Sequence, residues 1–262
     1  MTGHEARTIK EPEAPGARAI GRSLRTYHDP GRARDLDGFQ RRFIGAGGLG
    51  FDIGAHVGDR TASFVRIGAR AVAVEPQPRL AGLLRRLFRG SPGVTVAQVL
   101  VGAAAGDGML FMNTANPTIA TASRRFIAAA DGAPGWEGQR WDAQTAMPVT
   151  TLDALIDGHG VPDFIKIDIE GYEAEALRGL TRPVRTVSFE FTTIQRDVAY
   201  ASLDRLGALG YRAYNACLGE SMGFAHPAPL DAPAMRDWIG NLPDRANSGD
   251  VYATNDPARI TP

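Results

Sequence analysis

The chain has 262 residues, a formal net charge of +0 and a hydrophobic fraction of 44%. This length suits one large α/β domain or two small ones, with enough apolar residues for a core. The balanced charge gives no electrostatic reason to expect nucleic acid or anionic lipid as a partner. No apolar run in the sequence approaches the length of about 18 residues that spans a bilayer. The sequence also has only one cysteine, Cys217, and we therefore expect a cytoplasmic protein.

The two ends of the chain differ in composition. Residues 1–30 are predicted to form a disordered or extended tail, because they are charged, contain proline and have almost no aromatic side chains. Residues 31–262 are predicted to form a single domain that starts with a short amphipathic helix over residues 34–44. Residues 106–149 and 217–248 are expected to be insertions on the substrate side. The first is too long for an ordinary connection, and loops of that length are more often functional.

Apolar runs rich in β-branched residues alternate with helical patterns through the middle of the chain. This alternation predicts a mostly parallel sheet with helices on both faces. The strands are expected at residues 49–53, 71–75, 94–101, 163–169 and 184–191, and short strand-like runs follow at 211–216 and 250–254. The helices are expected at residues 60–67, 80–88 and 173–180.

A glycine turn follows the first strand, in the sequence FDIGAHVGDRT at residues 51–61. Gly54 and Gly58 allow a left-handed backbone and a close approach to a ligand. In open α/β sheets, ligands bind beyond the carboxyl ends of the strands, which is where this turn lies. The spacing is G-x-x-x-G, whereas dinucleotide enzymes carry G-x-G-x-x-G. The turn therefore indicates a nucleoside site but does not favour a dinucleotide.

Glu75 ends the second strand about 20 residues beyond the glycine turn, the place where an acidic side chain accepts hydrogen bonds from ribose hydroxyls. The alternative is a solvated carboxylate or a helix cap ahead of Pro76. Together with the glycine turn, this position favours ribose binding.

The predicted strand DFIKIDIEG carries ionisable side chains where a central strand is normally apolar. Residues two apart in a strand share a face, so Lys166, Asp168 and Glu170 are expected to project together. Such charges are costly unless they are paired, liganded or exposed at the end of the strand. A structural ion pair of Lys166 with Asp168 or Glu170 is the alternative to a catalytic role.

The segment DFIKIDIEGYEAEALRGL at residues 163–180 resembles the signature of FkbM-type methyltransferases, K-x-D-x-E-G-x-E followed by a helix that ends L-x-G. FDIGAHVGDRT is similar to the glycine loop of that family, AVAVEPQP to its second strand, MPVTTLDALI to the segment before the fourth strand and VSFEF to the next strand. The resemblance covers residues 49–254. His56 departs from it, because the family often has asparagine there.

The resemblance implies a Rossmann-like class I methyltransferase fold with an antiparallel C-terminal strand. It also implies S-adenosyl-L-methionine as cofactor and O-methylation of a hydroxyl on a sugar, polyketide or related small molecule. We expect Glu75 to hold the ribose and residues 99–102 to pass near the adenine. The rest of the cofactor site is expected from the glycine turn and the strand before it, at Asp52, Gly54, Ala55, Gly58 and Thr61.

The expected catalytic groups lie at two strand ends. Asp168 and Glu170 would orient the acceptor or remove its proton, and Lys166 would fix their charge state. Glu190, between two phenylalanines at the end of its strand, is a second candidate base. Carboxylates of these residues could instead bind a divalent cation, but we assign no metal ligand at this stage. Trp136 and Trp141, in the first insertion, could form a platform for a sugar or another flat apolar face.

Two other functions fit the pattern less well. A nicotinamide-dependent oxidoreductase would suit the fold. However, the glycine spacing differs, and with only Lys10 and Lys166 in the chain there is no lysine four residues after a tyrosine. A non-catalytic module that binds a cofactor or partner is the second alternative. The sequence leaves the acceptor and the oligomeric state open.

Overall fold

The computed structural model describes residues 16–262. The part of the predicted tail at residues 1–15 lies outside these residues. For the rest of the tail the prediction is wrong, because α1 (Ala17–Tyr27) is a helix and α2 (Pro30–Gln40) begins where the tail was expected to end. The Asp29 carboxylate accepts hydrogen bonds from the Gly31 and Arg32 amides, and Pro30 occupies the first turn of α2. This Asp-Pro pair is a standard helix start.

The main sheet confirms the predicted α/β architecture. Its seven strands run in the order β3-β2-β1-β7-β8-β10-β9, and the five from β3 to β8 pair in parallel. Only β10 runs antiparallel to both of its neighbours. The strands are β1 (Leu49–Ile53), β2 (Arg70–Val74), β3 (Val94–Ala97), β7 (Phe164–Ile167), β8 (Thr186–Thr192), β9 (Ala213–Leu218) and β10 (Ser248–Thr254).

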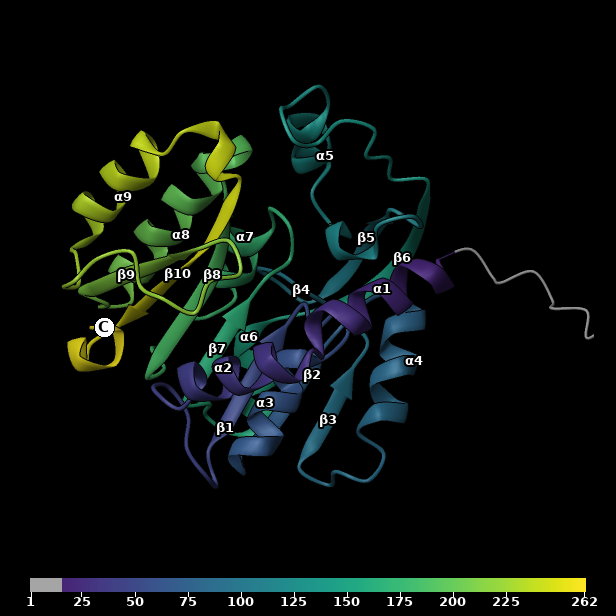
Figure 1. The fold of residues 1–262 in the computed structure, drawn as a ribbon, viewed down its shortest axis with the longest axis horizontal. Coiled ribbons are helices and arrows are strands. Elements are labelled where there is room, and N and C mark those ends of the chain that lie inside the picture. The colour runs from purple at the N-terminus through teal and green to yellow at the C-terminus, as the bar shows by residue number, and fades with distance from the viewer. Residues whose placement is uncertain (1–15) are drawn as a thin grey trace, which may run out of the picture.

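Helices cover both faces of this sheet (Figure 1). On one face, α2, α3 and α4 pack on an apolar layer that includes Phe43 and Phe164. The opposite face carries a larger apolar cluster under the four helices that follow β6. The remaining long helices are α3 (Asp59–Ile67), α4 (Pro78–Leu87), α6 (Leu152–His159), α7 (Glu173–Arg178), α8 (Arg196–Ala208) and α9 (Ala232–Asn241). No helix within residues 16–262 has both the length and the apolar character needed to cross a bilayer.

The first predicted insertion folds into an arm with its own three-stranded sheet, ordered β4-β6-β5. Consequently the prediction of one strand over residues 94–101 is wrong: β3 stays in the main sheet, whereas β4 (Leu100–Val101) pairs with β6. Between β3 and β4 the chain leaves the main sheet, because β4 forms its hydrogen bonds with β6. The arm comprises β5 (Gly106–Met112), a 3₁₀ turn at Pro117–Ile119, α5 (Arg124–Ala130) and β6 (Ala143–Thr150).

Candidate active site

The tips of β1 and β7 meet at one point of the sheet edge. The two strands pair in register up to Ile53 and Ile167, so Gly54 and Asp168 are the next residues on neighbouring strands. Gly54 has φ 86°, and a Cβ atom there would lie 1.8 Å from the Asp168 carbonyl oxygen. Only glycine permits this conformation and this approach. The two predicted halves of the site are therefore in direct backbone contact.

A cavity opens beside this contact. We call it the Glu75 cavity. Its walls are largely apolar and come from the tips of β1 and β2, from β4 and from the arm. Residues 99–101, expected near the adenine of a cofactor, line it. The other lining residues include Ile53, Gly54, His56, Val74, Pro76, Gln77, Leu110, Pro117, Thr118, Asp168 and Tyr172.

Glu75 is only 2% exposed and has a defined orientation. Its Oε2 accepts a hydrogen bond from the His56 amide and its Oε1 one from the Gln77 amide, both at 2.8 Å. Burial raises the pKa of Glu75 to about 7, although these two bonds oppose the shift. The remaining lone pairs of a carboxylate in this position can accept hydrogen bonds from the hydroxyls of a ligand.

Three residues predicted at the cofactor have internal partners. Thr61 is fully buried and donates its hydroxyl to Asp52 Oδ2 at 2.6 Å, while its amide donates to the same oxygen at 3.0 Å. Asp52 thus holds the first turn of α3. Gly58 contacts neither cavity at the site, and a Cβ atom there would lie 2.6 Å from Leu84 Cδ2. The glycine at 58 is explained by packing against α4.

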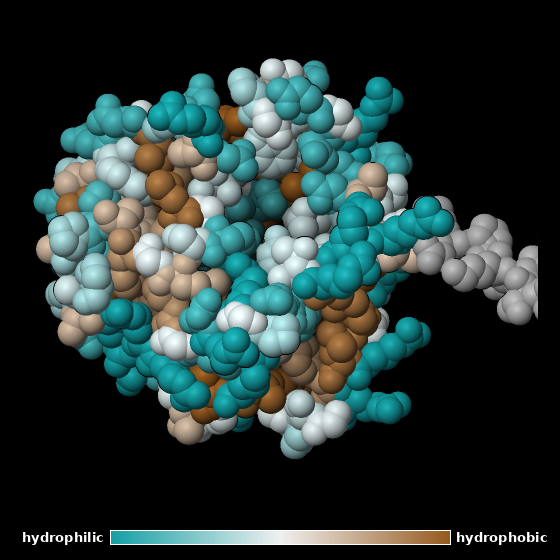
Figure 2. All heavy atoms as spheres, in the orientation of Figure 1, coloured by the Kyte–Doolittle hydropathy of each residue, from teal (hydrophilic) through white to brown (hydrophobic). Residues whose placement is uncertain are grey.

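A second cavity adjoins the first. We call it the acidic cavity, because its lining includes six carboxylates. The two cavities share Gly54, His56, Thr118 and Asp168. Figure 2 shows a hollow on this face of the molecule with hydrophilic residues around it. The lining carboxylates are those of Asp52, Asp59, Asp168, Glu170, Glu190 and Glu220.

Sheet register brings charged side chains from three strands together beneath this cavity. Lys166 on β7 is fully buried, and its ammonium lies 3.2 Å from Asp168 Oδ2 and also contacts Asp250 Oδ1. Arg60 Nη2 lies 3.3 Å from the other oxygen of Asp250. Asp250 on β10 stands opposite Glu190 on β8. The ion pair of Lys166 with Asp168, which the sequence offered as an alternative to a catalytic role, therefore exists within the site. The second partner of Lys166 is Asp250 and not Glu170.

These contacts divide the carboxyl groups into two kinds. Burial opposes ionisation of Asp168, but the charges of Lys166 and Arg60 and a hydrogen bond with Glu190 outweigh it and lower the pKa of Asp168. Burial and then the negative charge of Asp168 raise the pKa of both Glu170 and Glu190 well above the usual range. One carboxylate is therefore held ionised beside two that have no compensating cation of their own.

Glu170 departs from the expected alternation of side chains along β7. The strand ends at Ile167, and Glu170 has φ 55°, a left-handed conformation that is uncommon outside glycine. Its carbonyl accepts a hydrogen bond from the Thr121 hydroxyl at 2.7 Å. The Glu173 carboxylate accepts bonds from the Ile169 and Gly171 amides at 3.0 and 3.2 Å. Glu173 thus fixes the turn that presents Glu170 to the cavity.

The mouth of the acidic cavity is built from segments far apart in the sequence. Tyr27 comes from α1, Trp136 from the arm, and Glu220 and Asn247 from the segment between β9 and β10. Trp136 Nε1 donates to Asn247 Oδ1 at 3.1 Å, which joins the two predicted insertions across the cavity. Of these residues only Trp136 was predicted at the site, and Asp250 was not predicted either. Trp141, predicted together with Trp136, lines neither cavity, and its Nε1 donates to the Ile119 carbonyl at 2.8 Å.

His56 lies between the two cavities and contacts both. Its φ of 47° is in the left-handed region, where histidine and asparagine are tolerated better than most residues. The Tyr27 ring packs edge-on against it at 5.5 Å between ring centroids. Burial lowers the pKa of His56 to about 4, and its Nε2 has no hydrogen-bond partner among the described residues. A neutral imidazole therefore faces the junction of the cavities.

Comparison with known proteins identifies the family. The model of the methyltransferase FkbM domain matches residues 52–213, more than half of the chain. The chain belongs to the FkbM methyltransferase family. The match begins at Asp52 in the glycine turn and includes Glu75, the Lys166–Glu170 segment and Glu190. Among curated protein sequences, none is significantly similar to this one.

Several solved methyltransferase structures are similar to this chain at low sequence identity. A precorrin-6y C5,15-methyltransferase from Geobacter metallireducens has 16% identity and a TM-score of 0.41, with 85% of this chain and 86% of that chain covered. A TehB-like SAM-dependent methyltransferase from Corynebacterium glutamicum has 12% identity and a TM-score of 0.43, with 89% and 93% covered. An O-methyltransferase from Bacillus cereus, solved in complex with SAH, has 12% identity and a TM-score of 0.43, with 95% and 94% covered.

Proposed function

We propose that the protein is an S-adenosylmethionine-dependent O-methyltransferase that acts on a hydroxyl of a sugar, a polyketide or a related small molecule. The observation that carries this proposal is the junction of two cavities at Gly54 and Asp168. One cavity is largely apolar and has a single buried carboxylate, Glu75, and the other is acidic. This pairing suits a nucleoside cofactor on one side and a polar acceptor on the other.

The residues of the Glu75 cavity fit the cofactor. Glu75 would accept hydrogen bonds from the ribose hydroxyls, and residues 99–101 would contact the adenine. Gly54, which lines both cavities, and Ala55, which lines the acidic cavity, would follow the methionine part toward Asp168. When bound, S-adenosylmethionine supplies a methyl group on a sulfonium sulfur, and the carbon–sulfur bond breaks as a bond to the acceptor oxygen forms. Gly58 and Thr61 support this surface from behind, since each has an internal partner or packing contact, and Asp52 holds Thr61 while it also lines the acidic cavity.

The acidic cavity would hold the acceptor. The Asp168 side chain is 32% exposed and lines both cavities, so it can accept a hydrogen bond from an acceptor hydroxyl at their junction. Glu170 and Glu190 face the same point, and the raised pKa makes either of them, in its ionised form, a base for the hydroxyl proton as the ether forms. Trp136 lines the same cavity as these carboxylates, and an aromatic side chain beside polar groups is typical of sugar sites. The polar lining favours a polyhydroxylated acceptor over an apolar one.

Lys166 and Arg60 act as positioning residues in this scheme. Neither Lys166 nor Asp250 lines a cavity at the site, and together with Arg60 they form a buried charge network behind Asp168. The ammonium keeps Asp168 ionised and fixes the direction of its carboxylate. Holding the acceptor oxygen in line with the methyl group contributes to catalysis by fixing orientation in advance.

Direct titration separates this function from the alternatives. Purified protein should bind S-adenosylmethionine and S-adenosylhomocysteine, and should not bind NADPH. With radiolabelled S-adenosylmethionine, label should pass to a component of a panel of sugars and polyketide alcohols. Asp168→Asn should abolish turnover while cofactor affinity stays within about threefold of wild type. The control Asp157→Asn, on the exposed face of α6, should retain full turnover. Preference for NADPH, or full turnover in Asp168→Asn, would reject the proposal.

A further inference from the structure

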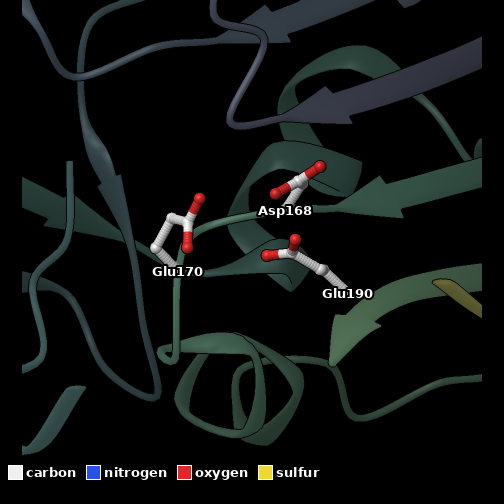
Figure 3. A group of neighbouring side chains, drawn as sticks. All are labelled: Asp168, Glu170 and Glu190. Atoms are coloured by element: carbon white, nitrogen blue, oxygen red, sulfur yellow. The ribbon is translucent and has the colours of Figure 1, made fainter. Parts of the chain in front are cut away.

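Three carboxylates converge at the floor of the acidic cavity. Asp168 and Glu170 follow β7, and Glu190 lies near the end of β8. Each offers one oxygen atom, and these oxygens all lie within 4.8 Å of one another. Figure 3 shows the three groups turned toward a common point from three different places on the backbone. Like charges at this separation repel unless a cation or protons lie between them.

Two of the three groups have unsatisfied oxygens. Glu170 is 9% exposed, and its carboxylate has neither a hydrogen-bond partner nor an ion-pair partner in the part of the chain that the structure describes. Glu190 Oε2 is buried and likewise has no hydrogen-bond partner there. A buried acceptor without a partner is costly, and native structures normally satisfy it with a neighbour, a water molecule or an ion.

The nearby protein cations are already engaged. Lys166 lies between Asp168 and Asp250, and Arg60 lies against Asp250. Within residues 16–262, no arginine, lysine or histidine forms a salt bridge with Glu170 or Glu190. The charges of Lys166 and Arg60 balance Asp168 and Asp250, which leaves Glu170 and Glu190 without a cation. Two protons, or one cation of charge about +2 in their place, would neutralise the two glutamates.

We propose that Asp168, Glu170 and Glu190 bind one divalent cation of the Mg²⁺, Mn²⁺ and Ca²⁺ class. Oxygen ligands select these hard cations over softer metals. Metal–oxygen bonds for this class are about 2.0–2.6 Å, so oxygens on opposite sides of an ion lie about 4–5 Å apart. Three oxygens within 4.8 Å of one another can therefore contact a single ion. The unpartnered oxygens of Glu170 and Glu190 would become ligands.

The cation would lie at the acceptor side of the junction between the cavities, since Asp168 lines both of them. Open coordination positions would point into the acidic cavity, where a hydroxyl of the acceptor can bind. A metal-bound hydroxyl loses its proton more easily than a free one and is held in a fixed place. This role rests on the O-methyltransferase function proposed above, whereas binding of the cation does not.

Binding of Mn²⁺ to the full chain tests the inference without any activity assay. After treatment with EDTA and its removal, the protein is titrated with Mn²⁺, and free Mn²⁺ is followed by its electron paramagnetic resonance signal. We expect one Mn²⁺ to bind per chain. Glu170→Gln and Glu190→Gln should each weaken binding by about tenfold or more, since each removes a ligand charge. Glu175→Gln, whose carboxylate pairs with Arg178 on α7, should bind as wild type does.

Thermal unfolding measurements show whether a variant that binds Mn²⁺ weakly is still folded. Mn²⁺ should raise the melting temperature of wild type and of Glu175→Gln, because a ligand that binds only the folded state stabilises it. Without Mn²⁺, Glu170→Gln and Glu190→Gln should melt at or above the wild-type temperature, since glutamine has the size and neutrality of the protonated carboxyl group that the raised pKa favours. With Mn²⁺ they should show little further rise.

The outcomes separate the cation from the proposed function. Absence of stoichiometric Mn²⁺ binding in wild type, or unchanged binding in both glutamine variants, overturns the cation site. If that protein still binds S-adenosylmethionine and transfers methyl groups, the proposed function stands and only the cation is refuted. Bound Mn²⁺ in a protein that does not bind S-adenosylmethionine would support the cation and refute the methyltransferase.

Discussion

Gly54→Ala tests the contact between the tips of β1 and β7 on which the whole site depends. An alanine at this position must keep φ near 86° with a Cβ atom 1.8 Å from the Asp168 carbonyl oxygen. Real Cβ atoms do not approach closer than about 3.0 Å, so the two tips must separate by about 1 Å. The substitution therefore perturbs the backbone of the site directly, without removing any functional side chain.

The expected cost follows from two contributions. A left-handed conformation costs a non-glycine residue about 1–2 kcal/mol. Separation of the tips also strains the hydrogen bonds from the Gly54 and Ala55 amides to the Val74 carbonyl, at 2.9 and 3.0 Å, and from the Asp168 amide to the Ile53 carbonyl, at 2.9 Å. At about 1 kcal/mol for each lost bond, the free energy of unfolding should fall by about 4–5 kcal/mol in total.

Two other glycines serve as matched controls. Gly47 has φ 77°, and a Cβ atom added there would have no neighbour within 4 Å, so Gly47→Ala should cost only the conformational penalty of about 1–2 kcal/mol. Gly82 lies inside α4 and is also free of close neighbours, so Gly82→Ala should stabilise the protein by about 0.5–1 kcal/mol. The difference between the Gly54 and Gly47 variants isolates the close approach of the two strand tips.

The test measures three quantities for each of the three variants: the free energy of unfolding in denaturant, the affinity for S-adenosylmethionine and the turnover. The Gly54 variant should lose stability, and any folded fraction should have little turnover because Asp168 has moved. Equal free energies of unfolding for the Gly54 and Gly47 variants would mean that the tips are not in contact. The argument for a shared junction would then fail.

Three further predictions follow from the same geometry. Burial raises the pKa of Glu75 to about 7, and ribose hydroxyls donate hydrogen bonds to the ionised form. The affinity for S-adenosylmethionine, measured by calorimetry, should therefore rise about tenfold from pH 6 to pH 8. Glu75→Gln should bind S-adenosylmethionine about 1–3 kcal/mol more weakly and show no such rise. Lys166→Met should lower the free energy of unfolding by about 3–5 kcal/mol in denaturant titrations, because it leaves buried carboxylates unpaired. Tyr27→Ala should raise the acceptor KM in steady-state kinetics and leave cofactor affinity unchanged.

The parts of the site that local sequence could predict are those at the ends of parallel strands. A glycine turn after the first strand and an acidic residue after the second are adjacent in any sheet of this type, so Gly54 and Glu75 could be placed without coordinates. The charges at Lys166 and Asp168 were conspicuous because they interrupt an apolar strand. Their proximity to the glycine turn follows from the pairing of β7 with β1.

The residues that local sequence could not predict reach the site through contacts between elements far apart in the chain. Asp250 looks like an ordinary first residue of a short strand, and it reaches Lys166 only because β10 inserts antiparallel beside β8. Tyr27 belongs to a segment whose composition suggested a tail. Its helix forms part of the cavity wall because it packs over the glycine turn, where the Tyr27 ring meets His56. Glu173 matched the family signature, but its role as a cap of the turn at Ile169 and Gly171 required the structure.

The antiparallel strand has a consequence for the chemistry of the site. If Lys166 had Asp168 as its sole partner, the ammonium would be fully engaged by that carboxylate. Asp250 also pairs with the Lys166 ammonium and is itself paired with Arg60. Only one Asp168 oxygen is therefore needed to pair with Lys166, at 3.2 Å, and 32% of the side chain stays exposed to the cavity. The pairing of β10 with β8 thus lets a buried lysine keep Asp168 ionised while leaving it free to bind a hydroxyl or a cation.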